Sequence, residues 1–510
     1  MSTATPSEHR SGGRLPRWGA LAAGPALALG VYLLCSMGAA PGLEEPGRRT
    51  LALLVWMASW WLLEAIPLAA TALLPIAAGP LMGVLSVGEA TAPYANKVIF
   101  LFLGGFMLAL AMERSGLHKR VALMTVALTG TRPRMVVAGF MLATGFMSMW
   151  MSNTAAAVMM LPIGMSIVAL VRERTSEDSG PLGRCVMLGI AYAASIGGVA
   201  TPIGTPPNAI LIGFLRARFG FEVSFLEWMV VGVPTVALML PVAWLLLTRV
   251  VFPIRGGRIP GGAELIRAER AALGSMSRAE RTVAGVFVLT VGAWVLRDPL
   301  AMLAPSWEWW LVRMDDSVIA IAAAVALFVI PVRGDRWEAA LDWETAERLP
   351  WGVLILFGGG LSLAAAVSKS GLDVAVGNQA GFLGGAPVVV VILALTGVIV
   401  FVTEVTSNTA TATIFFPLLA GAAPALGIDP VLLLTPVCLG VSMAFMLPMA
   451  TPPNALVFGT GLVTIRQMAW AGLWLNFISI GMSTLIAMTV VRATLSAQFI
   501  AERGAVAQTE

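Results

Sequence analysis

Long apolar stretches separated by short polar connections dominate the hydrophobic pattern of the chain. Within each stretch the apolar residues follow one another without a period of two, which favours helices over the strands of a membrane barrel. A helix needs about 20 apolar residues to cross the hydrocarbon of a bilayer. The pattern therefore predicts an all-α polytopic membrane protein, with about 11 transmembrane helices and two re-entrant hairpins.

The predicted elements occupy almost the whole chain. The stretches expected to cross as helices are residues 20–40, 51–65, 68–87, 98–112, 186–215, 228–251, 283–296, 318–330, 352–367, 431–462 and 472–491. The two hairpins are expected at residues 135–171 and 388–420. The polar remainder comprises the tails, 1–19 and 493–510, and one long linker, 253–282, which divides the chain into halves.

The two halves carry the same three segments in the same order. The first half has FLFLGGFMLALAMERSGL (100–117), MSNTAAAVMMLPI (151–163) and GGVATPIGTPPNAILIGF (197–214). The second has LILFGGGLSLAAAVSKSGL (354–372), TSNTATATIFFPLL (406–419) and MAFMLPMATPPNALVFGTG (443–461). An odd number of predicted crossings separates the equivalent segments. We therefore expect an inverted repeat, a plan that transporters use to place substrate and ion sites near the midplane.

Composition supports this assignment to the membrane. Hydrophobic residues make up 58% of the 510 positions and charged residues 12%, about half the charged fraction of a soluble domain. The three cysteines have no disulfide or metal spacing, and the net charge of +4 implies no nucleic acid. Basic residues are about twice as frequent in loops on the side of the N-terminus, although Arg48 and Arg49 oppose this bias. It predicts a cytoplasmic N-terminus.

A polar triplet stands at the middle of each predicted hairpin. Serine, asparagine and threonine favour turns and helix N-termini, because their side chains bond the local backbone. At membrane depth such irregular backbone has to be buried in protein or line a wet cavity. The triplets are Ser152, Asn153 and Thr154 in the first half and Ser407, Asn408 and Thr409 in the second.

The sequence T-P-P-N interrupts the helices predicted at 186–215 and 431–462. Two successive prolines cannot continue a helix, so each break frees carbonyl oxygens on one side and a helix N-terminus on the other. Carbonyl and hydroxyl oxygens suit a small hard cation, while helix N-termini favour anions. Because neither hairpin nor broken helix contains lysine or arginine, an anion here would depend on helix dipoles and on co-bound cations.

Two acidic residues fall in or beside apolar segments. Glu64 ends the second predicted helix, where a hydrogen-bonding structural role is favoured, and Glu404 precedes the second triplet. Intramembrane acids are candidates for function. The sequence leaves open whether Glu404 supports the hairpin or tunes a cation site.

At this point the motifs resemble a known family. SNTAAAVMMLPI, SNTATATIFFPLL and the paired TPPNA segments are similar to those of the divalent anion:sodium symporters, the INDY-type dicarboxylate transporters. WWLLEAIPLAATALLP (60–75) resembles a stretch near the start of that family, and the resemblance covers about residues 51–485. It implies a homodimer whose protomers each have a scaffold and a mobile transport domain and work by an elevator movement.

The resemblance also implies specific site residues. One sodium site would use Ser148, Ser152, Asn153 and the backbone around Gly204, and the other Thr403, Ser407, Asn408 and the backbone around Ala450. Substrate carboxylates would meet Asn153, Thr154, Thr205, Asn408, Thr409, Thr451 and Pro452. The implied division is 20–96 (scaffold), 97–252 (first repeat), 253–282 (cytoplasmic linker), 283–349 (two helices) and 350–492 (second repeat).

The expected function is sodium-coupled symport of small divalent anions, with succinate, malate or fumarate favoured, across a bacterial cytoplasmic membrane. Citrate or sulfate transport and sodium-independent exchange on the same fold remain alternatives. Thr205 stands where other members carry a different small residue, which bears on anion preference. An enzyme is not expected, because no catalytic dyad or metal-ligand set is visible, and we expect no organic cofactor. The inverted repeat argues against a channel.

Overall fold

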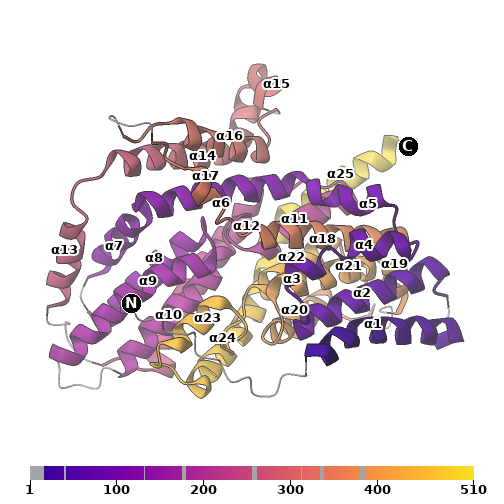
Figure 1. The fold of residues 1–510 in the computed structure, drawn as a ribbon, viewed down its shortest axis with the longest axis horizontal. Coiled ribbons are helices and arrows are strands. Elements are labelled where there is room, and N and C mark those ends of the chain that lie inside the picture. Colours follow the sequence, from indigo (N-terminus) through magenta and orange to yellow (C-terminus); the bar gives the residue numbers. More distant parts are fainter. Residues whose placement is uncertain are drawn as a thin grey trace, which may run out of the picture.

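The computed structural model describes residues 17–39, 42–130, 132–174, 180–255, 261–311, 313–333, 338–379 and 385–509. In these ranges the chain is helical, as predicted (Figure 1). Seven of the described helices are long and apolar enough to cross a membrane, and four shorter apolar helices accompany them. Helices α1 and α2 lie together along one edge, and α14 and α16 along another (Figure 1).

Several long helices lie outside the hairpins and the broken helices. They are α1 (Arg17–Leu34), α2 (Glu45–Leu63), α6 (Lys97–Ser115), α12 (Phe225–Leu245), α14 (Arg278–Leu303), α16 (Asp316–Val329), α18 (Trp351–Lys369) and α24 (Ile465–Ile486). Shorter helices are α13 (Gly262–Ala272) in the predicted linker, α15 (Glu308–Leu311), α17 (Trp343–Ala346) and the C-terminal α25 (Leu495–Thr509).

The helix predicted at 68–87 is instead three short helices. They are α3 (Leu68–Thr71), α4 (Leu74–Leu81) and α5 (Val87–Thr91). Pro75 stands in the first turn of α4, and a proline there starts a new helix because it has no N–H to donate. Gly83 follows with a positive φ of 67° and turns the chain before α5. The apolar pattern was correct here, but it did not show these interruptions.

Ion pairs divide the helix ends between two faces of the molecule. The Arg114 face is defined by Arg114, Arg120, Glu280 and Asp342, which form the pairs Arg114–Asp342 (2.7 Å) and Arg120–Glu280 (2.7 Å). The Lys97 face is defined by Lys97, Glu222, Arg297 and Asp315, with Lys97 paired to Glu222 (3.0 Å) and Asp315 (2.6 Å). Helix α14 runs between them, because Glu280 stands near its start and Arg297 near its end.

The equivalent helices α6 and α18 run in opposite directions. Helix α6 begins at the Lys97 face and ends beside Arg114. Helix α18 begins shortly after Asp342, at the Arg114 face. Just beyond the end of α18, Asp373 pairs at 2.7 Å with Arg218, which lies at the end of α11. Arg218 lies close in sequence to Arg216, which pairs with Glu222 of the Lys97 face. The repeat is therefore inverted, as the sequence predicted.

The two hairpins open toward opposite faces. The first consists of α8 (Pro133–Ser148) and α9 (Asn153–Arg174). Helix α10 starts on the side where α9 ends and runs toward the Lys97 face. The second consists of α20 (Val388–Thr403) and α21 (Asn408–Ala425), whose Gly421 packs against Asp373 near the Lys97 face. Both hairpins turn at their polar triplet.

Each broken helix is two helices joined by an irregular segment. The first pair is α10 (Gly180–Gly198) and α11 (Pro206–Phe219), and the second is α22 (Pro430–Val441) and α23 (Pro452–Gly459). Helix α10 packs on α23 and α11 packs on α21 and α22, so the two repeats interlock.

Short helices that the sequence did not predict follow α6 and α18. They are α7 (Leu117–Thr129) and α19 (Leu372–Gln379). The glycine of each S-G-L segment, Gly116 and Gly371, has a positive φ, 80° and 69°, that ends one helix and re-aims the chain into the next. Glycine tolerates this backbone region best, which explains why the sequence recurs.

Candidate functional site

The tip of the first hairpin carries three of the residues expected to bind sodium. Helix α8 ends at Ser148, α9 begins at Asn153, and Ser152 lies in the turn between them. The Ser152 Oγ accepts the N–H of Ala155 at 3.2 Å, so it caps α9 as the triplet predicted. Ser148 is buried, Asn153 is half-buried and Ser152 is exposed. The tip is thus held by protein on one side and accessible at Ser152.

Oxygen atoms converge on the side-chain amide of Asn153. The Ser148 Oγ lies 2.7 Å from Asn153 Oδ1 and 2.7 Å from the carbonyl oxygen of Ala194. The Asn153 amide atom that faces Ser148 also lies 3.1 Å from the carbonyl oxygen of Ala194 and 3.3 Å from that of Gly204. The Ser148 hydroxyl has one proton and can satisfy only one acceptor. With its nitrogen turned inward the amide donates to all three oxygens; with its oxygen inward, the cluster suits a cation.

The second hairpin repeats this arrangement. Thr403 Oγ1 lies 2.6 Å from Asn408 Oδ1 and 3.1 Å from the carbonyl oxygen of Val441, so one hydroxyl proton again faces two acceptors. Ser407 is the half-buried N-cap of α21, and Ala450 is buried in the following break. Both clusters therefore combine hydroxyl, amide and carbonyl oxygens, which are hard neutral ligands for an alkali cation.

The residues expected to contact substrate lie at helix N-termini. Thr154 and Thr409 are half-buried in the first turns of α9 and α21. Thr205 and Thr451 are the buried N-caps of α11 and α23, and Pro452 is exposed beside Thr451. Helix N-termini carry a partial positive charge and free N–H groups, so each repeat presents two anion-favouring helix ends together with an oxygen cluster.

The asparagine of each T-P-P-N segment holds its break together. The Nδ2 of Asn208 donates to three carbonyl oxygens of the preceding segment, those of Gly198 (3.2 Å), Val199 (3.3 Å) and Thr201 (2.8 Å). The Nδ2 of Asn454 donates to the carbonyl oxygens of Ala444 (3.2 Å) and Leu447 (3.0 Å). Both side chains are fully buried. The T-P-P-N motif predicted a helix break but not this role of its asparagine.

Glu404 organises the second break. Its buried carboxylate accepts hydrogen bonds from three successive backbone N–H groups and one side chain: Phe445 N (2.6 Å), Met446 N (2.9 and 3.0 Å), Leu447 N (3.1 Å) and Asn476 Nδ2 (2.7 Å). The same segment contains Ala450. Glu404 therefore supports the backbone of the second break and not the hairpin that contains it, and an effect on a cation site stays a prediction.

The two breaks differ in a way that explains this acid. Helix α10 ends seven residues before Thr205, whereas α22 ends ten residues before Thr451. The earlier end of α22 leaves more backbone N–H groups without helical partners, and buried N–H groups need acceptors. In the first repeat the position equivalent to Glu404 is Met149, whose backbone carbonyl accepts the hydroxyl of Thr201.

Glu64 stands at the end of α2. It is exposed and forms the C-cap of α2, where its φ of 47° is positive and its N–H donates to the carbonyl of Trp60. Its backbone thus ends α2, while the hydrogen-bonding role favoured for its side chain stays a prediction.

Comparison with known proteins identifies the family. A family model described as the sodium:sulfate symporter transmembrane region matches residues 21–495. The sodium-dependent dicarboxylate transporter SdcS of Staphylococcus saprophyticus is 43% identical over 459 residues, covering 89% of this chain and 88% of its own. The protein of the same name from Staphylococcus aureus strain USA300 is 44% identical over 439 residues, covering 85% and 84%.

Solved structures with a similar fold are also transporters. The YdaH transporter of Alcanivorax borkumensis aligns with a TM-score of 0.54 and 17% identity, covering 87% of this chain and 98% of its own. MtrF of Neisseria gonorrhoeae aligns with a TM-score of 0.51 and 15% identity, covering 91% and 97%. At this identity both show the fold alone. Because the family model spans nearly the whole chain, this protein is a membrane transporter, not an enzyme, and belongs to the sodium:sulfate symporter family that its motifs resemble.

Proposed function

We propose that the protein is a sodium-coupled symporter of C4-dicarboxylates such as succinate, malate and fumarate. The observation that carries the proposal is the pair of oxygen clusters at the hairpin tips, each beside helix N-termini. The relatives named sodium-dependent dicarboxylate transporters match over most of both chains, which supports both the coupling ion and the substrate class.

Each cluster would bind one sodium ion. The residues assigned to the first ion are Ser148, Ser152, Asn153 and the backbone of Gly204, and those assigned to the second are Thr403, Ser407, Asn408 and the backbone of Ala450. The inward-facing amide oxygen of Asn153 is the orientation that a cation stabilises, since the cluster then has more oxygen atoms than protons.

The dicarboxylate would bind between the two tips. One carboxylate would meet Asn153, Thr154 and Thr205, and the other Asn408, Thr409, Thr451 and Pro452. Since residues 135–171, 186–215, 388–420 and 431–462 contain no lysine or arginine, the negative charges are met by helix N-termini and by sodium. Substrate affinity therefore depends on sodium, and sodium affinity depends on substrate by the same factor.

Transport would proceed by an elevator movement between two bodies. The proposed scaffold consists of α1–α6 and α14–α18, and the proposed transport body of α8–α12 and α20–α24. Three short helices, α7, α13 and α19, connect them. We assign the homodimer contact to the scaffold and the membrane to the bacterial inner membrane. The N-terminus and the Arg114 face are placed in the cytoplasm, because arginine is concentrated in loops on that side.

Uptake of labelled succinate into proteoliposomes tests the proposal. An inward sodium gradient should drive uptake, potassium should not replace sodium, and Asn153→Ala or Asn408→Ala should abolish it. Uptake that needs internal succinate but no sodium would mean exchange instead of symport. Sodium-driven uptake of sulfate or citrate but not succinate would remove the substrate assignment.

A further inference from the structure

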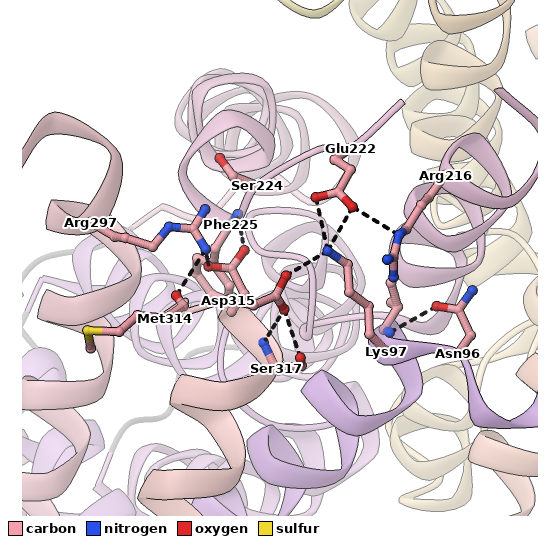
Figure 2. A network of polar contacts seen from close by, with 12 residues as sticks. Asn96, Lys97, Arg216, Glu222, Ser224, Phe225, Arg297, Met314, Asp315 and Ser317 are labelled. Atoms are coloured by element: carbon pink, nitrogen blue, oxygen red, sulfur yellow. Dashed lines mark hydrogen bonds and ion pairs between the residues drawn. The ribbon is translucent and has the colours of Figure 1, made fainter. Parts of the chain in front are cut away.

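Charged side chains from both proposed bodies meet at the Lys97 face (Figure 2). Lys97 begins α6 and Asp315 is the N-cap of α16, both in the proposed scaffold. Glu222 lies between α11 and α12, and Arg216 near the end of α11, both in the proposed transport body. A cavity of about 680 Å³, which these four side chains help to line, opens beside them.

Lys97 bridges the two bodies. Its Nζ lies 2.6 Å from Asp315 Oδ2 and 3.0 Å from both carboxylate oxygens of Glu222. Glu222 also accepts from Arg216 Nε at 3.0 Å, and Asp315 Oδ1 accepts from the N–H and hydroxyl of Ser317 at 3.0 and 2.7 Å. Each carboxylate that contacts Lys97 is therefore also oriented by a hydrogen-bond partner in its own body (Figure 2).

Asp316 makes a second tie between the bodies. Its Oδ2 accepts the N–H of Phe225, the first residue of α12, at 2.8 Å. The aspartate is fixed within the scaffold, because Arg297 Nη1 lies 3.0 Å from Oδ1 and Trp294 Nε1 donates to its backbone carbonyl at 3.0 Å. The start of α12 is thus held by an acid that belongs to the other body.

The ring of Phe225 connects this tie to the first hairpin. It stacks on Trp294 of α14, with centroids 4.3 Å apart and planes at 8°, and on Trp150, with centroids 6.3 Å apart and planes at 9°. Trp150 lies in the hairpin tip between Ser148 and Ser152. The contact between the bodies therefore reaches the turn that carries the first oxygen cluster.

We propose that these contacts form a latch, defined as Lys97, Glu222, Asp315, Asp316 and Phe225, which holds the transport body against the scaffold and has to open before that body moves. This inference rests on the elevator movement proposed above. A displacement of one body by more than a few ångströms would break every ionic contact of the latch, since hydrogen bonds beyond about 3.5 Å are lost. The side chain of Glu222 is 59% exposed and that of Lys97 28%, so water can replace their contacts and the latch can open.

Cysteine labelling measures the position of the transport body without any substrate. Ser152→Cys places a thiol at the accessible hairpin tip, while the native cysteines, Cys35, Cys185 and Cys438, are all buried. A membrane-impermeant maleimide is applied to one side or the other of oriented vesicles holding the full-length protein. In this background Lys97→Gln and Glu222→Gln each remove the Lys97–Glu222 ion pair of the latch and leave the Asp316–Phe225 hydrogen bond in place.

The matched control is Lys369→Gln. Lys369 pairs with Glu89 at 2.6 Å, and both residues lie in the proposed scaffold. This variant removes a lysine–glutamate pair of the same kind that does not join the two bodies.

The latch predicts that Lys97→Gln and Glu222→Gln each change the ratio of labelling from the two sides by about fivefold, in the same direction, as loss of a partly exposed ion pair allows. Lys369→Gln should leave the ratio unchanged. An unchanged ratio in both latch variants, or an equal change in the control, would overturn the proposal. Because no dicarboxylate is added, labelling does not depend on the substrate. A shifted ratio, together with wild-type protein of unaltered Ser152 that fails to take up succinate, would retain the latch and remove only the substrate assignment.

Discussion

Replacement of Glu404 by methionine tests how the second oxygen cluster is supported, since methionine occupies the equivalent position, Met149, in the first repeat. The change would remove the acceptor of three backbone N–H groups and of the Asn476 side chain. A buried donor without a partner costs about 1–3 kcal/mol. Phe445 and Asn476 are buried, while Met446 and Leu447 are half-buried and can reach water. We expect a loss of about 3–6 kcal/mol in the free energy of unfolding.

Glutamine at the same position should have a smaller effect. It keeps one carbonyl oxygen as an acceptor but presents an amide N–H₂ to donors, so we expect a loss of about 1–3 kcal/mol. The assays are the thermal unfolding temperature of the purified protein in detergent and the sodium concentration for half-maximal succinate uptake. Glu344→Gln is the control, because the side chain of Glu344 is 85% exposed.

The relative unfolding temperatures of the variants test this role of Glu404. The unfolding temperature should fall from wild type to Glu404→Gln to Glu404→Met, and Glu404→Gln should require more sodium because the segment holding Ala450 is less fixed. If Glu404→Met unfolds at the wild-type temperature, the hydrogen bonds from these four donors do not stabilise the break. If Glu404→Gln lowers the unfolding temperature but leaves the sodium requirement unchanged, the acid supports the fold without supporting the ion site.

Two further predictions concern packing and charge. Gly197→Ala would place a methyl group against the backbone of Gly145, where α10 packs on α8. We therefore expect a strongly reduced yield of folded protein in detergent. Gly285→Ala is the control and should express normally, because the space around Gly285 is open. Arg218→Gln leaves the buried carboxylate of Asp373 without its guanidinium at 2.7 Å. Since the arginine is 37% exposed and water screens part of the pair, we expect the free energy of unfolding to fall by about 1–3 kcal/mol, measured as a lower unfolding temperature. An unchanged unfolding temperature would mean that water fully replaces the arginine.

The inverted repeat and the positions of the breaks could be predicted because they depend on local signals. Successive prolines end a helix in any environment, and a polar triplet inside an apolar stretch turns the chain. Pro75 and Gly83 are equally local signals, but the continuous apolar pattern around them masked the division into α3, α4 and α5. The short helices after Gly116 and Gly371 were missed because they lie in mixed sequence between clear apolar spans.

The supports of the site depend on contacts between distant segments. Glu404 bonds a backbone segment about 40 residues away and Asn476, 72 residues away. The acid was visible as a candidate in the sequence, but only the fold supplies its partners. The Lys97–Asp315 pair joins residues 218 positions apart. In contrast, the side chains of each oxygen cluster stand in short motifs, so the resemblance to a known family led to a prediction of them. The carbonyl oxygens of Ala194 and Val441 come from segments 46 and 38 positions away and were not predicted.

Equilibrium binding of labelled succinate to the purified protein, measured while sodium replaces potassium at constant ionic strength, tests whether sodium and the anion bind together. Binding should rise steeply with sodium, and Ser148→Ala and Thr403→Val should each raise the sodium requirement about tenfold, which corresponds to about 1.4 kcal/mol. Ser166→Ala, which removes an exposed hydroxyl of α9 that donates to the carbonyl of Pro162 in the same helix, should bind as wild type. Succinate binding of equal strength in potassium and in sodium would contradict the account.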